Sequence, residues 1–344
     1  MKVALRIFVL LLTVAAVLLR AQNRSAVPSD RPDTPFKLAN LEGVSNGKPA
    51  IVVKDRIYDL QRANEFVTQQ ARLTTVAIPL NNIQIIEQYD RVKARLYQIA
   101  NFLASSPATF GTSSDSTRFV APLLYPWNII AVAVNYRAHG AEMNRNLAAD
   151  YDKDPPFVFA KSPKATLNAP GAPVIIPEGR DRIDWEIELA AIVGKKSSNV
   201  KSAQAEDYLW GFGLILDISD RGGQTRKDPL FNADWFSGKS RDGFAPMGAT
   251  IVPKEFLKNY QNVGLKLAVN GQVMQESNTS YMVHNVRELL QFITSVQTLE
   301  PGDIIATGTP EGVGNGRKPP VFLKRGDVIT AEIEGVGSIR TPVK

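Results

Sequence analysis

Residues 183–193 read Ile-Asp-Trp-Glu-Ile-Glu-Leu-Ala-Ala-Ile-Val and predict a buried β-strand with an acidic face. Charged and apolar residues alternate at its start, so on a strand Asp184, Glu186 and Glu188 project from one face. The apolar run 189–193 that follows is typical of a strand buried on both faces, which carries the carboxylates toward the interior. A buried carboxylate without a counter-charge costs several kcal/mol, so this segment predicts a cationic partner.

Short β-branched runs, punctuated by proline and glycine, continue on both sides of this strand. They occupy residues 128–136, 172–177, 187–194, 212–219, 248–253, 264–271, 302–308 and 326–335. Only residues 203–208 and 286–296 have helical spacing among them. The pattern predicts an α+β or β-rich domain, because a doubly wound parallel fold needs a helix after nearly every strand.

The chain before residue 117 has a different pattern of apolar and turn residues. Residues 37–60 contain short apolar runs separated by turn residues, which predict an antiparallel meander. Residues 85–104 place apolar side chains at helical intervals, and a Ser-, Thr- and Gly-rich segment, 105–116, marks a linker. We therefore expect a small N-terminal domain with a helical linker over residues 36–116 and a second domain over 117–344.

The first 35 residues predict export. Lys2 and Arg6 precede the apolar run 7–19, which is the layout of a signal peptide and is short for a membrane span. Residues 1–21 are expected to be either cleaved or retained as a membrane anchor, and residues 22–35 to form a flexible tether. The expected location is periplasmic or extracellular, with membrane contact only if the segment stays uncleaved.

Composition restricts the chemistry available. The chain has no cysteine and only two histidines, which excludes disulfides, thiolate zinc sites and cysteine nucleophiles. A metal must therefore sit mainly on oxygen ligands, which favours magnesium, manganese or calcium. The formal charge of +6 is dispersed along the chain, which argues against a nucleic-acid partner and suits a small anionic substrate.

Asp217 adds a third carboxylate to the acidic strand. It is the single charged residue within the apolar stretch 213–218. Three buried carboxylates, from Glu186, Glu188 and Asp217, with water in the remaining positions make an octahedral oxygen site for a divalent cation. The alternative is that these acids line a solvated strand face and pair with lysine or arginine.

His139 and Glu142 are the strongest candidates for acid–base chemistry. On a helix they lie three apart on one face, where the carboxylate orients the imidazole and makes it a general base. Lys239 is a candidate for stabilising a developing oxyanion. In each case the alternative is an ordinary surface side chain, and His284 is interpreted as structural.

Two further segments could contact a substrate. Arg221 and Gln224 follow Asp217 by four and seven residues, and an arginine there suits bidentate recognition of a carboxylate. The glycine-dense turn 308–314 lets backbone approach a ligand closely, but alone it indicates only a tight loop. Solvated polar side chains are the alternative for both.

Taken together, these segments resemble the fumarylacetoacetate hydrolase family. The matching pieces are residues 132–143, 155–163, 183–194, 211–224, 235–248 and 277–314, in the family's order. The resemblance covers residues 130 to 344 and implies a mixed β-sandwich or roll, usually a homodimer, with magnesium, manganese or calcium. Position by position it implies metal ligands at Glu186, Glu188 and Asp217, a water-activating dyad on a lid at His139 and Glu142, and substrate contacts at Lys239, Arg221, Gln224 and Thr309.

The activity that the resemblance implies is hydrolysis of a carbon–carbon bond in a small diketo acid or acylpyruvate, through a metal-stabilised enolate in keto-acid catabolism. An isomerase, lyase or decarboxylase acting on a related keto acid is the alternative among enzymes, and a secreted binding module without catalysis is the alternative of another class. Ser219-Asp220-Arg221-Gly222 and Tyr281 depart from the family's common pattern, which leaves the substrate open.

Overall fold

The computed structural model describes residues 27–344, except 44–46, 146 and 228–229. The predicted signal peptide or anchor, and the start of the predicted tether, lie outside these residues. Within the described part of the chain, no helix is long and apolar enough to cross a membrane.

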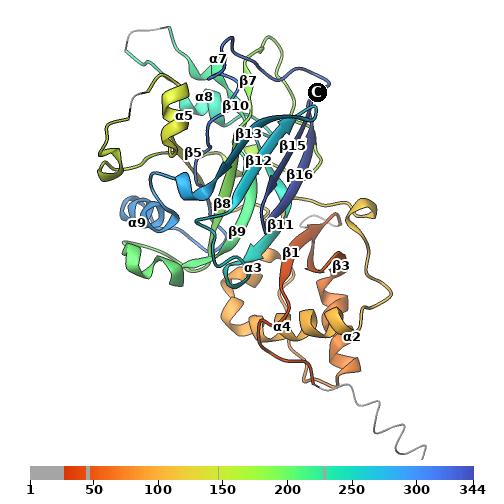
Figure 1. Ribbon diagram of the computed structural model, residues 1–344. Coiled ribbons are helices and arrows are strands. Elements are labelled where there is room, and N and C mark those ends of the chain that lie inside the picture. Colours follow the sequence, from red (N-terminus) through yellow and green to blue (C-terminus); the bar gives the residue numbers. More distant parts are fainter. Residues whose placement is uncertain (1–26, 44–46, 146, 228–229) are drawn as a thin grey trace, which may run out of the picture.

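A large, mainly antiparallel sheet organises the described residues (Figure 1). Nine of its strands follow the order β3 (Arg56–Asp59), β2 (Lys48–Val53), β1 (Phe36–Leu41), β11 (Ala245–Pro253), β9 (Leu209–Leu216), β8 (Ile187–Val193), β14 (Ile304–Ala306), β4 (Ile129–Ala133) and β5 (Phe157–Lys161). The tenth, β6 (Leu167–Asn168), pairs with β11. Among the named strands of the described residues, only β14 with β4 and β6 with β11 pair in parallel, so the structure confirms that the fold is not doubly wound.

A second sheet covers β8 and β9 to make the predicted sandwich. Its order is β13 (Gln272–Asn278), β12 (Gly264–Val269), β15 (Val328–Ile333) and β16 (Gly337–Pro342), all antiparallel. Apolar side chains of β8 and β9 share one buried cluster with those of β12 and β15. Burying such side chains stabilises the fold by roughly 1.5–3 kcal/mol each.

The N-terminal strands extend the large sheet. The antiparallel meander predicted over residues 37–60 is confirmed as β1–β3, and β1 pairs directly with β11. Helices α2 (Leu60–Gln70), α3 (Asn82–Glu87) and α4 (Tyr89–Ser105) pack at this end of the molecule (Figure 1). Their apolar residues share a core with β8, β9 and β11, so the two predicted domains meet in one hydrophobic cluster.

Outside the acidic strand, three predicted elements differ from those observed. The helix predicted over residues 85–104 is two helices, α3 and α4, separated at Gln88, whose ψ of 21° interrupts the α-helical conformation. Residues 203–208 form a 3₁₀ helix, η3 (Ser202–Asp207), and 172–177 form no strand beyond an isolated bridge at Val174. The helix predicted at 286–296 is confirmed as α9 (Val286–Val296), with a capping box at its start.

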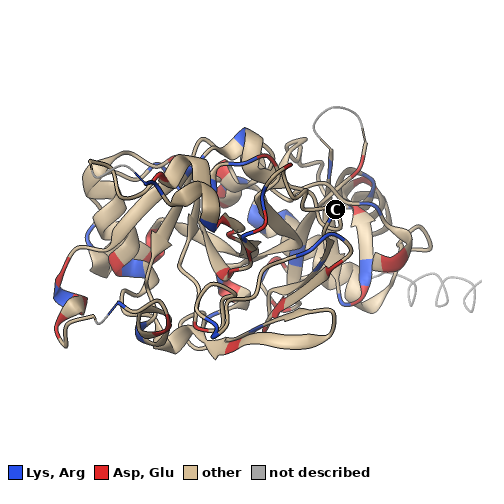
Figure 2. Cartoon of the chain, turned by 90° about the horizontal axis from the view of Figure 1, so that it is seen from above, with Lys and Arg blue, Asp and Glu red and all other residues tan. Residues whose placement is uncertain are grey.

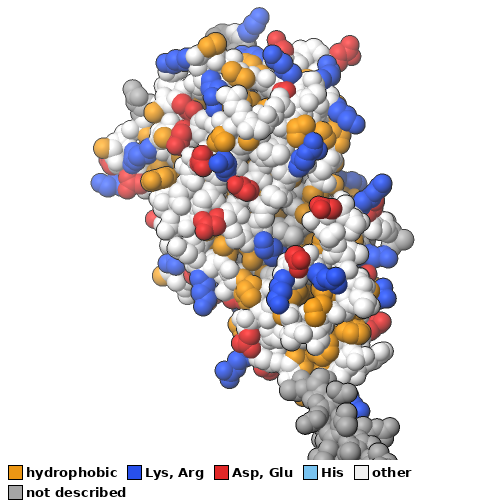
Figure 3. All heavy atoms as spheres, turned by 45° about the vertical axis from the view of Figure 1, so that its right-hand side comes forward, with side chains coloured by type: hydrophobic (Ala, Val, Ile, Leu, Met, Phe, Trp, Pro, Cys, Tyr) orange, Lys and Arg blue, Asp and Glu red, His pale blue; other side chains and the backbone are white. Residues whose placement is uncertain are grey.

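Charged side chains of both signs are scattered along the chain and do not gather in one region (Figure 2). On the face shown in Figure 3, acidic, basic and apolar groups alternate and no large area carries a single sign. The helices α5 (Arg137–Glu142), α6 (Pro163–Thr166), α7 (Arg221–Gln224) and α8 (Trp235–Lys239) complete the fold. Of these, α5, α7 and α8 lie at the end opposite α2 and α4, beside the two-stranded sheet of β7 (Ile183–Asp184) and β10 (Ser219–Asp220) (Figure 1).

Candidate metal centre

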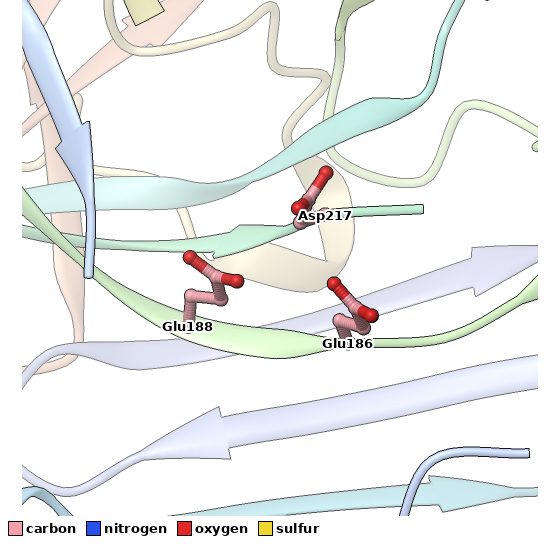
Figure 4. Close-up of side chains that lie close together, drawn as sticks. All are labelled: Glu186, Glu188 and Asp217. Carbon is pink, nitrogen blue, oxygen red and sulfur yellow. The ribbon is translucent and has the colours of Figure 1, made fainter. Parts of the chain in front are cut away.

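Glu186, Glu188 and Asp217 converge, as Figure 4 shows. Each offers a carboxylate oxygen, and these three oxygens lie within 4.8 Å of one another. All three residues are buried, with exposed fractions of 4%, 1% and 1%. An oxygen-only cluster of this size suits a hard divalent cation, so the predicted convergence of the three acids is confirmed by the geometry.

Local backbone pairing brings the three acids together. Glu188 lies on β8 opposite Ile215 of β9, and Asp217 comes directly after the end of β9. Glu186 lies between β7 and β8, where its carbonyl accepts a 2.9 Å hydrogen bond from the Asp217 N–H. The predicted uninterrupted alternation is therefore wrong, because the strand breaks at Trp185 and Glu186.

Asp184 does not join the other three acids. Its carboxylate accepts the backbone N–H groups of Gly314 and Asn315 at 2.7 and 3.1 Å, and the Nε–H of Arg221 at 2.9 Å. Asp184 thus anchors the glycine-dense turn that the sequence had indicated only as a tight loop.

Two of the three clustered carboxylates also have cationic partners. Lys239 donates to Glu186 at 2.7 Å and to Asp217 at 2.6 Å, and Lys161 donates to Asp217 at 2.5 Å. Arg221 donates to Glu186 through Nη2. The acids therefore both converge and pair with lysine and arginine, so the alternative predicted from sequence is also observed. It differs from the prediction in that the acids are buried and not solvated.

Lys161 is the participant that sequence reasoning missed. Its side chain is fully buried, and its ammonium group bridges Asp217 and the carbonyl of Ile218. The residue lies in segment 155–163, which contributed to the family resemblance without a role being assigned to it. A lysine within an apolar strand-like run was the available signal, because such a lysine needs a buried anion.

Glu188 is the acid without a cationic partner among the described residues. Its carboxylate accepts a hydrogen bond from the Gly308 N–H at 2.8 Å. Burial, together with the neighbouring Asp217 and Glu186, raises the pKa of Glu188 well above its usual range. Burial also opposes ionisation of Glu186, but Lys239 and Arg221 outweigh it and lower that pKa.

The charges in this cluster do not balance. Four buried carboxylates, those of Asp184, Glu186, Glu188 and Asp217, face three buried cations, those of Lys161, Arg221 and Lys239. If all seven groups are ionised, one negative charge is left over, and the raised pKa of Glu188 places the cost of that charge there. The donor set and this imbalance fit a divalent cation held by the three converging carboxylates.

Arg221 lies against two buried acids, and its predicted role in substrate binding stays a prediction. Its Nε and Nη2 atoms are both bonded to buried carboxylates, so the edge of the guanidinium that carries them cannot also receive a substrate carboxylate. The two acids together raise the pKa of Arg221, although burial opposes this. We therefore interpret Arg221 as a residue that positions Glu186.

The His139–Glu142 pair forms as predicted on α5. Nδ1 of His139 lies 2.7 Å from Oε1 of Glu142, and the other carboxylate oxygen accepts the Gly312 N–H at 2.8 Å. The carboxylate therefore fixes the Nδ1–H tautomer, which leaves Nε2 of His139 free to act as a base. The same carboxylate ties α5 to the glycine-dense turn.

One cavity is lined by most of the side chains described above. Its volume is about 230 Å³, below the roughly 300–1,000 Å³ of pockets for drug-sized ligands, so it suits a small substrate. His139, Lys239 and the three clustered acids line it, as do Arg221, Gln224 and Thr309. The hydroxyl of Thr309 donates to the Ile187 carbonyl at 2.9 Å and accepts from Gln275 at 2.8 Å, which fixes it to the scaffold. The predicted substrate contacts of Gln224 and Thr309 stay predictions.

Comparison with known proteins identifies similar chains. A family model described as fumarylacetoacetate (FAA) hydrolase C-terminal matches residues 128–344. The mitochondrial oxaloacetate tautomerase fahd2 of Xenopus laevis is 38% identical over 231 residues, which cover 67% of this chain and 70% of the relative. The human mitochondrial oxaloacetate tautomerase FAHD2A is 37% identical over 221 residues, covering 64% and 68%.

Solved structures share the fold. A probable 2-hydroxyhepta-2,4-diene-1,7-dioate isomerase from Mycobacterium abscessus aligns with a TM-score of 0.70 at 25% identity, covering 90% of this chain and 98% of that one. Maleylpyruvate hydrolase from Sphingobium sp. SYK-6, in complex with manganese(II) and pyruvate, aligns with a TM-score of 0.65 at 28% identity, covering 89% and 98%. The predicted β-rich α+β fold is confirmed, and the similar proteins include both isomerases and hydrolases.

Proposed function

Since this chain belongs to the fumarylacetoacetate hydrolase family, we propose that it is a divalent-metal-dependent enzyme that interconverts the keto and enol forms of a small 2-keto dicarboxylic acid such as oxaloacetate. The similarity to oxaloacetate tautomerases over about two thirds of the chain supports this choice of reaction. Metal dependence is supported by the cluster of three carboxylates. Magnesium and manganese are the proposed cations.

One observation carries the proposal. The imidazole of His139, oriented by Glu142 at 2.7 Å, lines the same small cavity as the three clustered carboxylates. Enolisation needs a base beside the carbon that loses a proton and a positive charge beside the carbonyl oxygen. The cavity brings together groups for both tasks.

Each side chain has a defined part in the reaction. Nε2 of His139 takes the proton from the carbon next to the keto group, and Glu142 stabilises the imidazolium that results. The ammonium group of Lys239 faces the same cavity and favours negative charge on the carbonyl oxygen. That oxygen takes a proton from solvent water to complete the enol, and the imidazolium returns to water the proton that it took from carbon. A divalent cation bound to the carboxylates would polarise the keto acid and stabilise the enolate further.

Hydrolysis of a carbon–carbon bond, the reaction predicted from sequence, is the second candidate. The similarity to maleylpyruvate hydrolase favours hydrolysis, because the alignment covers 98% of that chain. The two reactions differ in what His139 deprotonates. In tautomerisation it is carbon, and in hydrolysis it is a water that attacks the distal carbonyl.

The decisive assay follows both reactions with one protein preparation. We expect the protein with Mn²⁺ or Mg²⁺ to accelerate the loss of the ultraviolet absorbance of enol-oxaloacetate beyond the rate with the same cation alone. We expect EDTA to abolish the effect. Pyruvate release from acylpyruvates, measured with a coupled dehydrogenase, is expected to be slower.

The other outcomes separate the alternatives. Pyruvate release without tautomerisation contradicts the first candidate and supports the hydrolase. Carbon dioxide release from oxaloacetate supports a decarboxylase. If neither oxaloacetate nor an acylpyruvate is turned over with Mn²⁺ or Mg²⁺, both candidate reactions are contradicted. The non-catalytic binding module, the other alternative from sequence, is then favoured.

A further inference from the structure

Arg182 is a cation of the cavity that no carboxylate in the described part of the chain neutralises. Lys239 and Arg221 line the cavity too, but each forms ion pairs with buried acids. Among the described residues, no aspartate or glutamate oxygen forms an ion pair with Arg182, although its side chain is half-buried. A partly buried arginine beside a substrate cavity without an anionic partner indicates where an anion of the substrate binds.

The scaffold holds Arg182 in place. Its Nη2 donates to the side-chain oxygen of Asn315 at 3.1 Å, and its guanidinium carbon lies 5.4 Å from the centre of the Phe322 ring. The backbone N–H of Asn315 is itself bound to Asp184 at 3.1 Å, and the Arg182 carbonyl accepts the Arg221 N–H at 2.9 Å. Because an arginine carries five N–H donors, this arrangement leaves most of them for a ligand.

Arg182 and the clustered acids therefore offer two different kinds of contact within one cavity. The carboxylates and their cation suit the keto-acid end of a substrate. A guanidinium suits a second carboxylate, which it binds through two parallel hydrogen bonds. Arg145 lines the same cavity from its exposed rim and adds positive charge there.

We propose that Arg182 determines substrate specificity by binding the distal carboxylate of a dicarboxylic 2-keto acid. This inference rests on the proposed function, since it names the substrate class for the same site. The sequence indicated Arg221 as the residue that binds a substrate carboxylate, but its Nε and Nη2 atoms are occupied. The proposal assigns this contact to Arg182, which the sequence did not indicate. Monocarboxylic keto acids lack the group that Arg182 binds, so the enzyme is expected to discriminate against them.

The test uses two unreactive ligands of equal chain length. Malate and 2-hydroxybutyrate share the 2-hydroxy acid end and differ only in a distal carboxylate or methyl group. We expect calorimetric titration of the Mn²⁺-loaded wild-type protein to show about tenfold or more tighter binding of malate, the range for a hydrogen-bonded charge pair. Arg182→Gln should remove this preference while leaving the affinity for 2-hydroxybutyrate unchanged.

Two variants control for charge and fold. Arg182→Lys keeps the charge without the planar fork and should restore part of the preference. Arg180→Gln removes an arginine two residues away that pairs with Asp220 and does not line the cavity; Asp220 keeps Arg241 at 2.7 Å, so this variant should behave as wild type. An unchanged malate preference in Arg182→Gln overturns the inference, as does the absence of a preference in the wild type. Because neither ligand enolises, both outcomes are independent of whether oxaloacetate is turned over.

Discussion

An Asp217→Asn variant is expected to lose about 3–5 kcal/mol of folding free energy in the absence of added metal, the range for breaking a buried ion pair. Asp217 is 1% exposed and accepts hydrogen bonds from Lys161 at 2.5 Å and from Lys239 at 2.6 Å. Asparagine keeps one acceptor oxygen and no charge, so a buried ammonium group loses its counter-ion. Urea unfolding of EDTA-treated protein, followed by circular dichroism, measures the change.

Glu188→Gln is the matched control for this prediction. Glu188 is equally buried and belongs to the same cluster, but its partner is the Gly308 N–H, which a glutamine oxygen also accepts. Because burial already disfavours the charge of Glu188, we expect unchanged or increased stability of the metal-free protein. Both variants should lose Mn²⁺ affinity in calorimetry. Equal destabilisation by the two substitutions, or wild-type Mn²⁺ affinity in either, contradicts this assignment of the charges.

Asp217 pairs with lysines and Glu188 does not, and this difference explains how lysine pairing and cation binding coexist in one cluster. A carboxylate oxygen has two lone pairs, so an oxygen of Glu186 or Asp217 that accepts a hydrogen bond can still bind a metal. The lysines and Arg221 fix the orientation of both carboxylates before a cation binds. Glu188 then supplies the negative charge that these side chains leave unbalanced.

The clustering of the three acids was predictable from sequence because its signals are local. Glu186 and Glu188 precede an apolar run, and Asp217 interrupts another, so both segments indicated buried charge. The partners were not predictable in the same way. Lys161 lies 56 residues from Asp217, and no periodicity relates two residues that meet only through sheet pairing.

Strand β13 was not predicted and residues 172–177 were wrongly predicted as a strand, and both errors have a similar explanation. Strand β13 reads Gln-Val-Met-Gln-Glu-Ser-Asn and buries only Gln275, so it has no apolar alternation to indicate a strand. That glutamine bonds to Ile187, Thr309 and Pro310, which ties the strand to the site. Conversely, residues 172–177 are apolar enough to predict a strand, but they pair with the C-terminal segment only through a short bridge at Val174 and Ile176. Whether each segment forms a strand therefore depends on its polar contacts and on a neighbouring strand to pair with, and not on its local hydrophobicity.

A His139→Ala variant is expected to lower kcat for enol-oxaloacetate by about 10²–10⁴-fold, the usual contribution of a general base. His139 is 6% exposed, and Glu142 holds its ring at 2.7 Å with Nε2 unbonded. The imidazole is hydrogen-bonded to Glu142 and to none of the clustered acids, so Mn²⁺ affinity should be unchanged. Steady-state kinetics at saturating Mn²⁺, with calorimetry of the same samples, separates loss of the base from loss of the metal.

His284 supplies the matched control, because it is the chain's other histidine, is also buried, and does not line the cavity. His284→Gln should therefore leave kcat near the wild-type value even if stability falls. Glu142→Gln keeps an oxygen for the Gly312 N–H but removes the charge that stabilises the imidazolium, so its kcat should lie between those of wild type and His139→Ala. If His139→Ala retains wild-type kcat, another group accepts the proton and the assignment of His139 as the base is wrong.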